Sequence, residues 1–291
     1  MFVIDTAIRG SFMKQGVDLG FKLAMLTIAC LLFLAASATW IAPHDPEKAQ
    51  PQLRLKDPSY EYPLGTDHLG RCIFSRIVFG IRISLFIGIA VVLFSSLIGM
   101  VLGVAAGYFG GVVDDTIMRV VDAFLSFPSI FLALAVIGFL GSGIANLMLS
   151  LILVDWTGYA RLVRSSVLAL KGKEFLEAAK SLGASDLYIM SRHILPNILP
   201  SLLVMATLSV GYVILGAASL SFLGLGVQPP TPEWGAMMND ARPFLRTHPL
   251  VMIFPGIAIT TVVLAFNLLG EGIRVQLDPK FRAESSYGYE N

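Results

Sequence analysis

Apolar residues along this chain gather in long runs, and polar residues gather in the stretches between them. The apolar runs cover residues 23–42, 83–106, 117–140, 145–168, 199–225 and 250–269. A helix of about 20 apolar residues is long enough to cross the hydrocarbon core of a bilayer. The pattern predicts an all-α integral membrane protein with six transmembrane helices, which places both termini on the same side of the membrane.

The polar stretches divide the chain into three parts. Residues 1–82 hold an N-terminal tail, the first apolar run and a proline-rich external segment that is too polar to lie in lipid. Residues 83–280 hold the other five runs, and residues 281–291 form a short tail. Because the first run has full spanning length, we expect it to remain as a transmembrane helix and not to be removed as a signal peptide.

The longest polar interruption in the second half of the chain lies at residues 171–200. Apolar residues recur at helical spacing between Phe175 and Leu182, and a glycine follows, so two short helices separated at Gly183 are expected. Ser185 is a residue type that caps helix N-termini, and Pro196 is expected to end the second helix. Such a loop offers a surface to a protein outside the membrane.

Composition agrees with the membrane class. Hydrophobic residues make up 55% of the 291 residues, charged residues make up 14%, and the mean hydropathy is +0.75. A soluble domain could not bury this much apolar surface. The formal net charge of +1 leaves no basic face for nucleic acid, so we exclude that partner and expect membrane lipid instead.

The sequence lacks the motifs of the common catalytic and cofactor sites. Its only Gly-Lys pair, Gly172-Lys173, is followed by Glu174 and does not complete a phosphate-binding loop. The four histidines are scattered without metal-ligand spacing, and neither Cys30 nor Cys72 has such a neighbour. We therefore expect no catalytic residue, no metal site, no cofactor bound by this chain and no enzymatic activity.

Six strings of residues, in order along the chain, resemble one transporter family. They are Pro63-Leu-Gly-Thr-Asp-His-Leu-Gly-Arg71 with Ser75-Arg76, Tyr159-Ala-Arg-Leu-Val-Arg164, Glu177-Ala-Ala179 with Gly183 and Ile194-Leu-Pro196, Ser221-Phe-Leu-Gly-Leu-Gly226, Pro229-Pro-Thr-Pro-Glu-Trp-Gly235, and Asp278-Pro279. Together they are similar to permease subunits of binding-protein-dependent ABC importers, and most similar to the second permease of the dipeptide, oligopeptide and nickel branch. Cys72 departs from that branch, which usually has an acidic residue after this Gly-Arg.

The resemblance implies a type I ABC importer permease fold in which residues 171–200 form a coupling loop seated in a groove on an ATPase. The residues that match the family's loop motif are Glu177, Ala178, Ala179, Gly183, Leu195 and Pro196. The loop is then cytoplasmic, and so are both termini. The Lys and Arg bias points the same way more weakly, with twelve of these residues on the cytoplasmic side and eight on the other.

The same resemblance implies the partners and the location. The chain would pair with a homologous second permease in the bacterial inner membrane, as a multi-pass protein. Two cytoplasmic ATPase subunits would hold ATP and Mg, and an extracytoplasmic substrate-binding protein would deliver the cargo. Movement of the ATPases would then tip the permease pair between inward-facing and outward-facing states.

Ionisable residues inside spans are costly and are candidates for functional sites. Asp115, Arg119 and Asp122 lie at i, i+4 and i+7, so the arginine can pair with either acid, and a structural ion pair is the simpler interpretation. Asp155 has no basic neighbour in sequence, and Tyr159 follows one turn later. We expect Asp155 to line the translocation path and to favour a cationic group, with a hydrogen bond to a neighbouring helix as the alternative.

The polar loop at residues 228–249, ahead of the last apolar run, is stiffened by three prolines near its start. We take Trp234 and Glu233 as candidates for contact with a binding protein. Anchoring at the membrane interface explains Trp234 equally well.

The sequence thus indicates ATP-driven import of di- or oligopeptides, with a nickel or other metal chelate and glutathione as cargoes that it does not separate from peptides. An alternative of another class is a proton-coupled secondary transporter with Asp122 or Asp155 as the relay. That alternative predicts inverted internal repeats, and none is evident in the sequence. An intramembrane enzyme would need a nucleophile and a base at helical spacing, which this chain does not offer.

Overall fold

The computed structural model describes the backbone of residues 2–277 and the side chains of residues 19–277. Within these ranges the protein is helical, and its only extended pairing is an isolated bridge between Thr66 and Cys72. The motif Asp278-Pro279 and the tail at 281–291 lie outside the described residues. The elements are α1 (Phe2–Ala36), α2 (Ala38–Ile41), η1 (Pro51–Leu53), α3 (Ile73–Phe109), α4 (Gly111–Leu125), α5 (Ser129–Leu140), α6 (Ile144–Lys171), α7 (Glu174–Ser181), α8 (Asp186–Ile189), the π turn η2 (Met190–Ile194), α9 (Leu195–Phe222), α10 (Trp234–Ala241), η3 (Arg242–Phe244) and α11 (Leu250–Leu277).

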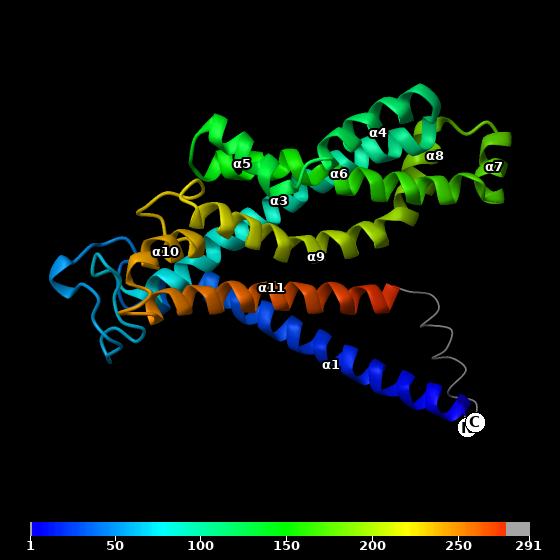
Figure 1. Ribbon diagram of the computed structural model, residues 1–291. Helices are drawn as coiled ribbons and strands as arrows, with labels where there is room; N and C mark the ends of the chain where they lie inside the picture. The colour runs from blue at the N-terminus through cyan, green and yellow to red at the C-terminus, as the bar shows by residue number, and fades with distance from the viewer. Residues whose placement is uncertain (1, 278–291) are drawn as a thin grey trace.

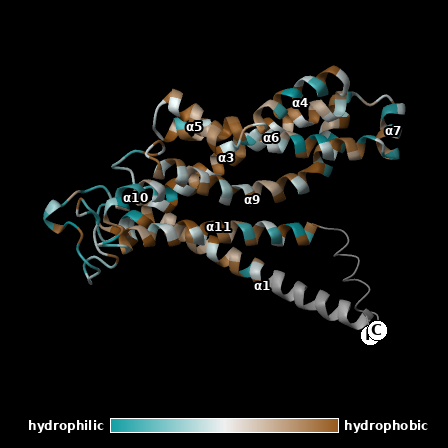
Figure 2. Cartoon of the chain, in the orientation of Figure 1, coloured by the Kyte–Doolittle hydropathy of each residue, from teal (hydrophilic) through white to brown (hydrophobic). Residues whose placement is uncertain are grey.

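The long helices form an elongated bundle (Figure 1). α3 packs along α6, α9 packs against both α3 and α11, and α1 packs on α11. The segment between α2 and α3 lies with α10 at one end of the bundle, called here the α10 end, while α7 and α8 lie at the opposite α7 end. Hydrophilic residues gather at these two ends (Figure 2). The distribution fits a protein whose middle lies in lipid.

Four helical stretches are long and apolar enough to cross a membrane, and they cover residues 19–36, 73–109, 186–222 and 250–277. α4 and α5 would pass together as a fifth span, but their axes differ by 89°. The single helix expected over residues 117–140 is therefore broken. Pro128 lies at the break and disfavours helical geometry at the residue before it. α6 is 28 residues long but contains Asp155, Arg161 and Arg164, and it does not qualify by composition.

Helix α3 begins at Ile73, ahead of the apolar run that starts near Ile83. Its first turns are covered by the preceding polar segment and by the start of α10, where Trp234 donates to the Ile77 oxygen. Arg76 donates to the backbone oxygens of Pro46 and Pro230, at 2.9 and 3.1 Å. The boundary expected at residue 82 therefore lies within α3, and the external segment proper ends at Cys72.

A stripe of glycines holds α3 against α6. Gly99, Gly103 and Gly107 recur every four residues and face α6. A Cβ at Gly99 would lie 2.4 Å from Tyr159 Cβ, and one at Gly103 would lie 2.6 Å from the Ala160 oxygen. Small residues at this spacing allow close backbone contact between helices in membranes. α3 and α6 are therefore in close backbone contact along this stripe, with no room for larger side chains.

Candidate functional site

The loop at residues 171–200 contains the break that the sequence predicts at Gly183. α7 ends in a Schellman motif: Gly183 N donates to the Lys180 oxygen at 3.0 Å, and Ala184 N donates to the Ala179 oxygen at 3.1 Å. Gly183 has a φ of +83°, with open space around its Cα. Backbone conformation therefore requires the glycine, and crowding does not. Ser185 caps α8 by accepting from Tyr188 N, as predicted.

α7 presents most of its surface to solvent. Leu176 is its one buried residue, Ala179 is half-buried, and Glu177 and Ala178 are exposed. Large apolar side chains are also exposed on α7, α8 and the turn between them. We call this set the loop surface, and it consists of Phe175, Leu182, Leu187 and Tyr188, with Leu182 88% exposed and Leu187 74% exposed.

Pro196 does not end the second helix, so that prediction is wrong. α8 passes through the π turn at Met190–Ile194 directly into α9, which makes one helical stretch from Asp186 to Phe222. A proline ring clashes with the carbonyl four residues earlier in a regular α-helix. The wider π turn immediately before Pro196 relieves that clash. Leu195 is half-buried and Pro196 exposed, both in the first turn of α9.

Two hydrogen bonds join this loop to the end of α3. The Tyr108 hydroxyl donates to Asp186 Oδ1 at 2.6 Å, and the Lys171 ammonium donates to the Tyr108 backbone oxygen at 2.8 Å. Tyr108 lies in the last turn of α3, Lys171 ends α6, and Asp186 begins α8. One tyrosine therefore ties three helices together at the α7 end, and we call these three residues the Tyr108 link.

A cavity of about 410 Å³ lies beside the Tyr108 link, between α7 and the ends of α3 and α6. Its polar lining residues are Tyr108, Lys171, Glu177, Lys180 and Asp186. α7 is therefore not packed solidly against the helices beside it. Leu176 and the connections at its two ends hold it in place.

The acidic residues of α4 pair with arginines of α6. Arg164 donates two hydrogen bonds to Asp114, to Oδ1 at 2.5 Å and to Oδ2 at 2.6 Å. Arg161 donates to Asp122 Oδ1 at 2.6 Å, with both side chains exposed. Asp122 is thus paired with α6 and not with Arg119, which is exposed on α4. The pair expected within α4 is replaced by pairs between helices.

Asp155 lines a cavity of about 200 Å³ between α5, α6 and α9. Ser129, Tyr212 and Gly216 line the same cavity, and no ion pair to Asp155 forms among residues 19–277. Tyr159 does not line it. Its side chain is fully buried, and its Cβ lies where α6 meets Gly99 of α3. The two residues therefore have different surroundings, although they lie one turn apart.

Trp234 and Glu233 are buried, which corrects their expected place on an open surface. Trp234 is 0% exposed, and its indole N–H donates to the Ile77 oxygen at 3.2 Å. Glu233 is 2% exposed and caps α10 by accepting from Gly235 N and Ala236 N, each at 2.9 Å. Burial raises the pKa of Glu233, and the two backbone N–H groups oppose that rise. Both residues fix α10 in place.

The Pro63–Arg71 string folds around a buried carboxylate. Asp67 accepts from Leu69 N and Arg71 N, each at 2.9 Å, and from Arg71 Nε at 2.6 Å. Arg71 also donates to Asp240 of α10 at 3.0 Å. Gly70 has a φ of +76°, and a Cβ there would overlap the Gln50 oxygen. The motif therefore shapes the external segment and fastens it to α10.

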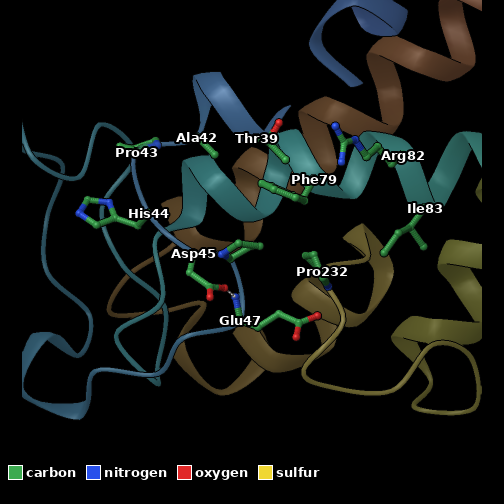
Figure 3. Close-up of a pocket in the computed structure, with 11 residues that line it drawn as sticks. Thr39, Ala42, Pro43, His44, Asp45, Glu47, Phe79, Arg82, Ile83 and Pro232 are labelled. Atoms are coloured by element: carbon green, nitrogen blue, oxygen red, sulfur yellow. Dashed lines mark hydrogen bonds between the residues drawn. The ribbon is translucent and has the colours of Figure 1, made fainter. Parts of the chain in front are cut away.

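A third cavity, of about 660 Å³, opens at the α10 end where α2, the external segment and α3 meet (Figure 3). Asp45 and Glu47 lie on one side of it and Arg82 on another. Arg82 is already engaged, since it donates to the Ala36 oxygen at 3.0 Å. Among residues 19–277, no group of three or more acidic, histidine or cysteine side chains is placed to hold a metal ion.

Several contacts of these sites were not predictable from local spacing. Tyr108 appeared in the sequence only as part of a glycine-rich turn, and Asp114 and Asp240 belonged to no motif. Their partners lie 78, 50 and 169 positions away along the chain, respectively. Unpaired charges at the ends of apolar runs are the one signal that could have marked them.

Comparison with known proteins gives a family match and close relatives that agree with each other. Residues 99–283 match the family described as binding-protein-dependent transport system inner membrane component. The nickel transport system permease protein NikC of Escherichia coli strain K12 is 43% identical over 266 residues, which covers 91% of this chain and 96% of NikC. The glutathione transport system permease protein GsiD of Pectobacterium atrosepticum is 46% identical over 273 residues, which covers 94% and 90% of the two chains.

Among solved structures, the inward-facing MetNI methionine ABC transporter is similar to this chain with a TM-score of 0.59. The match covers 71% of this chain and 98% of that one, at 20% sequence identity. At this identity the similarity concerns the fold alone. The expected type I importer permease fold is supported by it.

Proposed function

The chain belongs to the family of binding-protein-dependent transport system inner membrane components, and from this membership we propose the finer parts of its function. It is a multi-pass permease subunit of an ABC importer in the inner membrane, and it is not an enzyme. We propose that it imports di- or oligopeptides and is driven through its 171–200 loop by separate ATPases. The loop surface is the observation that carries this proposal, because large apolar side chains exposed outside the membrane mark a contact with another protein.

Six spans and cytoplasmic termini are part of the proposal. The sixth span is α6, which at 28 residues is longer than a bilayer requires, with its basic residues Arg161, Arg164 and Lys171 in the part toward the α7 end. The first turn of α1 and the last turn of α11 lie at the same end of the bundle as α7 (Figure 1). An even number of spans puts both termini on one side of the membrane. With the coupling loop in the cytoplasm, that side is cytoplasmic.

The coupling role falls to Glu177, Ala178, Ala179, Gly183, Leu195 and Pro196, together with the loop surface. Exposed Ala178 allows an ATPase groove to approach α7 closely, and exposed Glu177 offers a carboxylate to an arginine of that groove. Gly183 sets the angle between α7 and α8. ATP and Mg are held by the ATPases and not by this chain.

The family works with ATPase and substrate-binding partners. We propose two ATPase subunits and a homologous second permease. The binding protein docks at the α10 end on exposed residues of the external segment, such as Tyr60 and Glu47, since Trp234 and Glu233 are buried. Those two residues contribute indirectly by holding α10 in position.

Peptide cargo is favoured by the glutathione transport relatives, because glutathione is itself a tripeptide. Nickel remains the alternative on account of NikC. Asp155 is proposed to line the path, where its carboxylate favours the ammonium group of a peptide. Asp122 and Arg119 remain candidates for the path, since both are exposed on α4 of a subunit that we propose to pair with a second permease. Asp122 is already engaged by Arg161, which argues against a proton relay through it.

The proposal is tested with this chain, its second permease, the ATPases and the binding protein reconstituted in vesicles. Removing residues 173–186 should abolish co-purification of the ATPases and ATP-driven uptake of labelled dipeptide. Uptake that survives the deletion would refute the coupling assignment. Uptake by this chain alone under a proton gradient without ATP would establish the secondary transporter instead.

Cargo is decided separately, by thermal shift of the purified binding protein with dipeptides, glutathione and Ni²⁺. A ligand that binds only the folded protein raises its melting temperature by mass action. Stabilisation by dipeptides or glutathione supports the peptide proposal. Stabilisation by Ni²⁺ alone overturns it while leaving the coupling assignment intact.

A further inference from the structure

We propose that the Tyr108 link is the contact through which movement of the coupling loop reaches the paired helices α3 and α6, so that Tyr108 and Asp186 are positioning residues for ATP-driven transport. The inference rests on the proposed function of the loop. It adds residues outside the loop motif and names the helix that receives the movement.

The first argument is the weak packing of α7. A cavity of about 410 Å³ separates α7 from the ends of α3 and α6, and Leu176 is the one buried side chain of α7. A helix beside a cavity can shift without displacing its neighbours, because few atoms are in contact across the gap. Movement of α7 therefore passes along the chain to α8 and not sideways into α3.

The second argument is the geometry of the contact at α8. Asp186 is the first residue of α8, and its carboxylate accepts from the Tyr108 hydroxyl at 2.6 Å. Hydrogen bonds to charged groups are shorter and stronger than those between neutral groups. Tyr108 is half-buried at the end of α3, while Asp186 is exposed. Displacing α8 therefore pulls on a residue that is anchored in the bundle.

The third argument concerns what Tyr108 is attached to. The Lys171 ammonium donates to the Tyr108 backbone oxygen at 2.8 Å, which fastens the end of α6 to the end of α3. Along their length the two helices touch through Gly99, Gly103 and Gly107. α3 and α6 thus respond as one body, and the Tyr108 link joins that body to the α8–α9 helix at the α7 end.

The experiment compares variants in the complete reconstituted transporter, with uptake per ATP hydrolysed as the readout. Tyr108→Phe removes one hydroxyl and keeps the ring that packs edge-on against Phe109. We expect it to lower uptake per ATP by about tenfold, which is the scale of one hydrogen bond to a charged group. Co-purification of the ATPases should be unchanged, because the loop surface is intact. The matched control is Thr116→Val, which also removes one hydroxyl, from an exposed residue of α4 that donates only to the Val112 oxygen of its own helix.

Variants of Asp186 test the same hydrogen bond from its other side, in case Tyr108→Phe misfolds. Asp186→Ala, at an exposed position, should give the same loss as Tyr108→Phe. Asp186→Asn keeps an oxygen that accepts from the hydroxyl and should restore most of the coupling. The double variant Tyr108→Phe with Asp186→Ala should be no worse than either single variant, since both remove the same bond. Normal uptake per ATP in both single variants would overturn the proposal.

Hydrogen exchange on the purified chain separates this proposal from the proposed function. Loss of the link should raise the exchange rate of the α8 backbone amides by about tenfold in Tyr108→Phe and not in Thr116→Val. If the unaltered chain fails to bind ATPases, the proposed function fails and the coupling role fails with it. A different result is that the ATPases bind and Tyr108→Phe raises α8 exchange, but uptake per ATP is unchanged. In that case the proposed function stands and only the coupling role of the Tyr108 link is wrong.

Discussion

Asp155 illustrates how a single residue in a membrane protein is judged by its surroundings. It lines a cavity with Ser129 and Tyr212, and among residues 19–277 it has no ion-pair partner. An ionisable side chain in such a place is costly and therefore marks a functional candidate. The role of Asp155 in the path stays a prediction, and Tyr159, which the sequence placed on the same helix face, does not line this cavity and is buried beside α3.

Replacing Asp155 by Asn should change selectivity more than total activity. Uptake of a peptide with a free amino terminus should fall by about tenfold relative to one with a blocked terminus, since the charge-assisted contact is lost. Competitive uptake of the two peptides in vesicles measures this ratio. Asp115→Asn is the charge-matched control, on the exposed face of α4. An unchanged ratio in the Asp155 variant would remove it from the path.

Glu233 should make the stability of the protein depend on pH. Burial raises its pKa above the usual 4.5, so the folded state favours the protonated carboxyl more than the unfolded state does. Its stabilising contribution is therefore fully present below about pH 4.5 and is lost as the pH rises through the raised pKa. Glu233→Gln does not titrate. As the pH rises from about 4.5 to neutrality, the melting temperature of the unaltered protein should therefore fall relative to that of Glu233→Gln.

Thermal unfolding in detergent across this pH range checks the Glu233 prediction. Glu271→Gln serves as the control, because Glu271 is exposed and shares only a long ion pair with Arg274. A difference between the Glu233 proteins that does not vary with pH would show that this carboxyl does not titrate in that range.

At the scale of helices, the α3–α6 contact is the most demanding in the structure. A Cβ at Gly103 would lie 2.7 Å from Val163 Cβ and closer still to the Ala160 oxygen, so the helices must move apart to accept it. Gly103→Ala should lower the free energy of unfolding by about 1–3 kcal/mol. Gly138→Ala in α5 is the matched control, because nothing lies within 4 Å of its added Cβ.

Urea unfolding followed by tryptophan fluorescence compares the two glycine variants. The Gly138 variant should equal or exceed the unaltered protein in stability, since alanine favours helix over glycine by about 1 kcal/mol. Equal stability of the two variants would mean that α3 and α6 can move apart at little cost.

Local rules predicted some boundaries between helices and missed others. The break at Gly183 was predicted, because a positive φ angle depends on the residue itself. The continuity of the helix through Pro196 was not predicted, since it depends on a π turn that no residue pattern indicates. The 89° bend between α4 and α5 also escaped, because an apolar run looks the same whether the helix within it is straight or bent.

At the scale of the whole molecule, Arg71 joins two distant parts of the chain. It is 2% exposed, and it bridges Asp67 in its own loop and Asp240 of α10. Arg71→Met should lower the free energy of unfolding by about 3 kcal/mol, because buried Asp67 then keeps only the more distant Arg76, at 3.7 Å, as an ion-pair partner. Asp240→Asn should cost less, since Asp240 is 21% exposed and water can replace the contact.

Limited proteolysis of outward-oriented vesicles tests whether Arg71 holds the external segment. Cleavage within residues 47–66 should accelerate in Arg71→Met. Arg54→Lys, an exposed change in the same segment that keeps a cation near the Phe244 ring, should leave cleavage unchanged. Equal cleavage in all three proteins would show that other contacts hold the segment on α10.

The six-span pattern and the family motifs together indicated the class of this protein, and the fold comparison agrees. The pairings that fix its shape could not be predicted. Tyr108 with Asp186 and Arg71 with Asp240 join positions that no periodicity relates. They exist because the bundle brings helix ends together, and that arrangement follows from tertiary packing.

The unbroken helical stretch from Asp186 to Phe222 has a mechanical consequence. The π turn at Met190–Ile194 lies within it and is a place where helices bend, so the lever proper is α9, whose 28 residues span roughly 42 Å at about 1.5 Å per residue. Pivoting α9 by about 5° at its α7 end sweeps its other end through roughly 4 Å. A lever arm of this length turns an ångström-scale push near the pivot into a larger displacement beside α10.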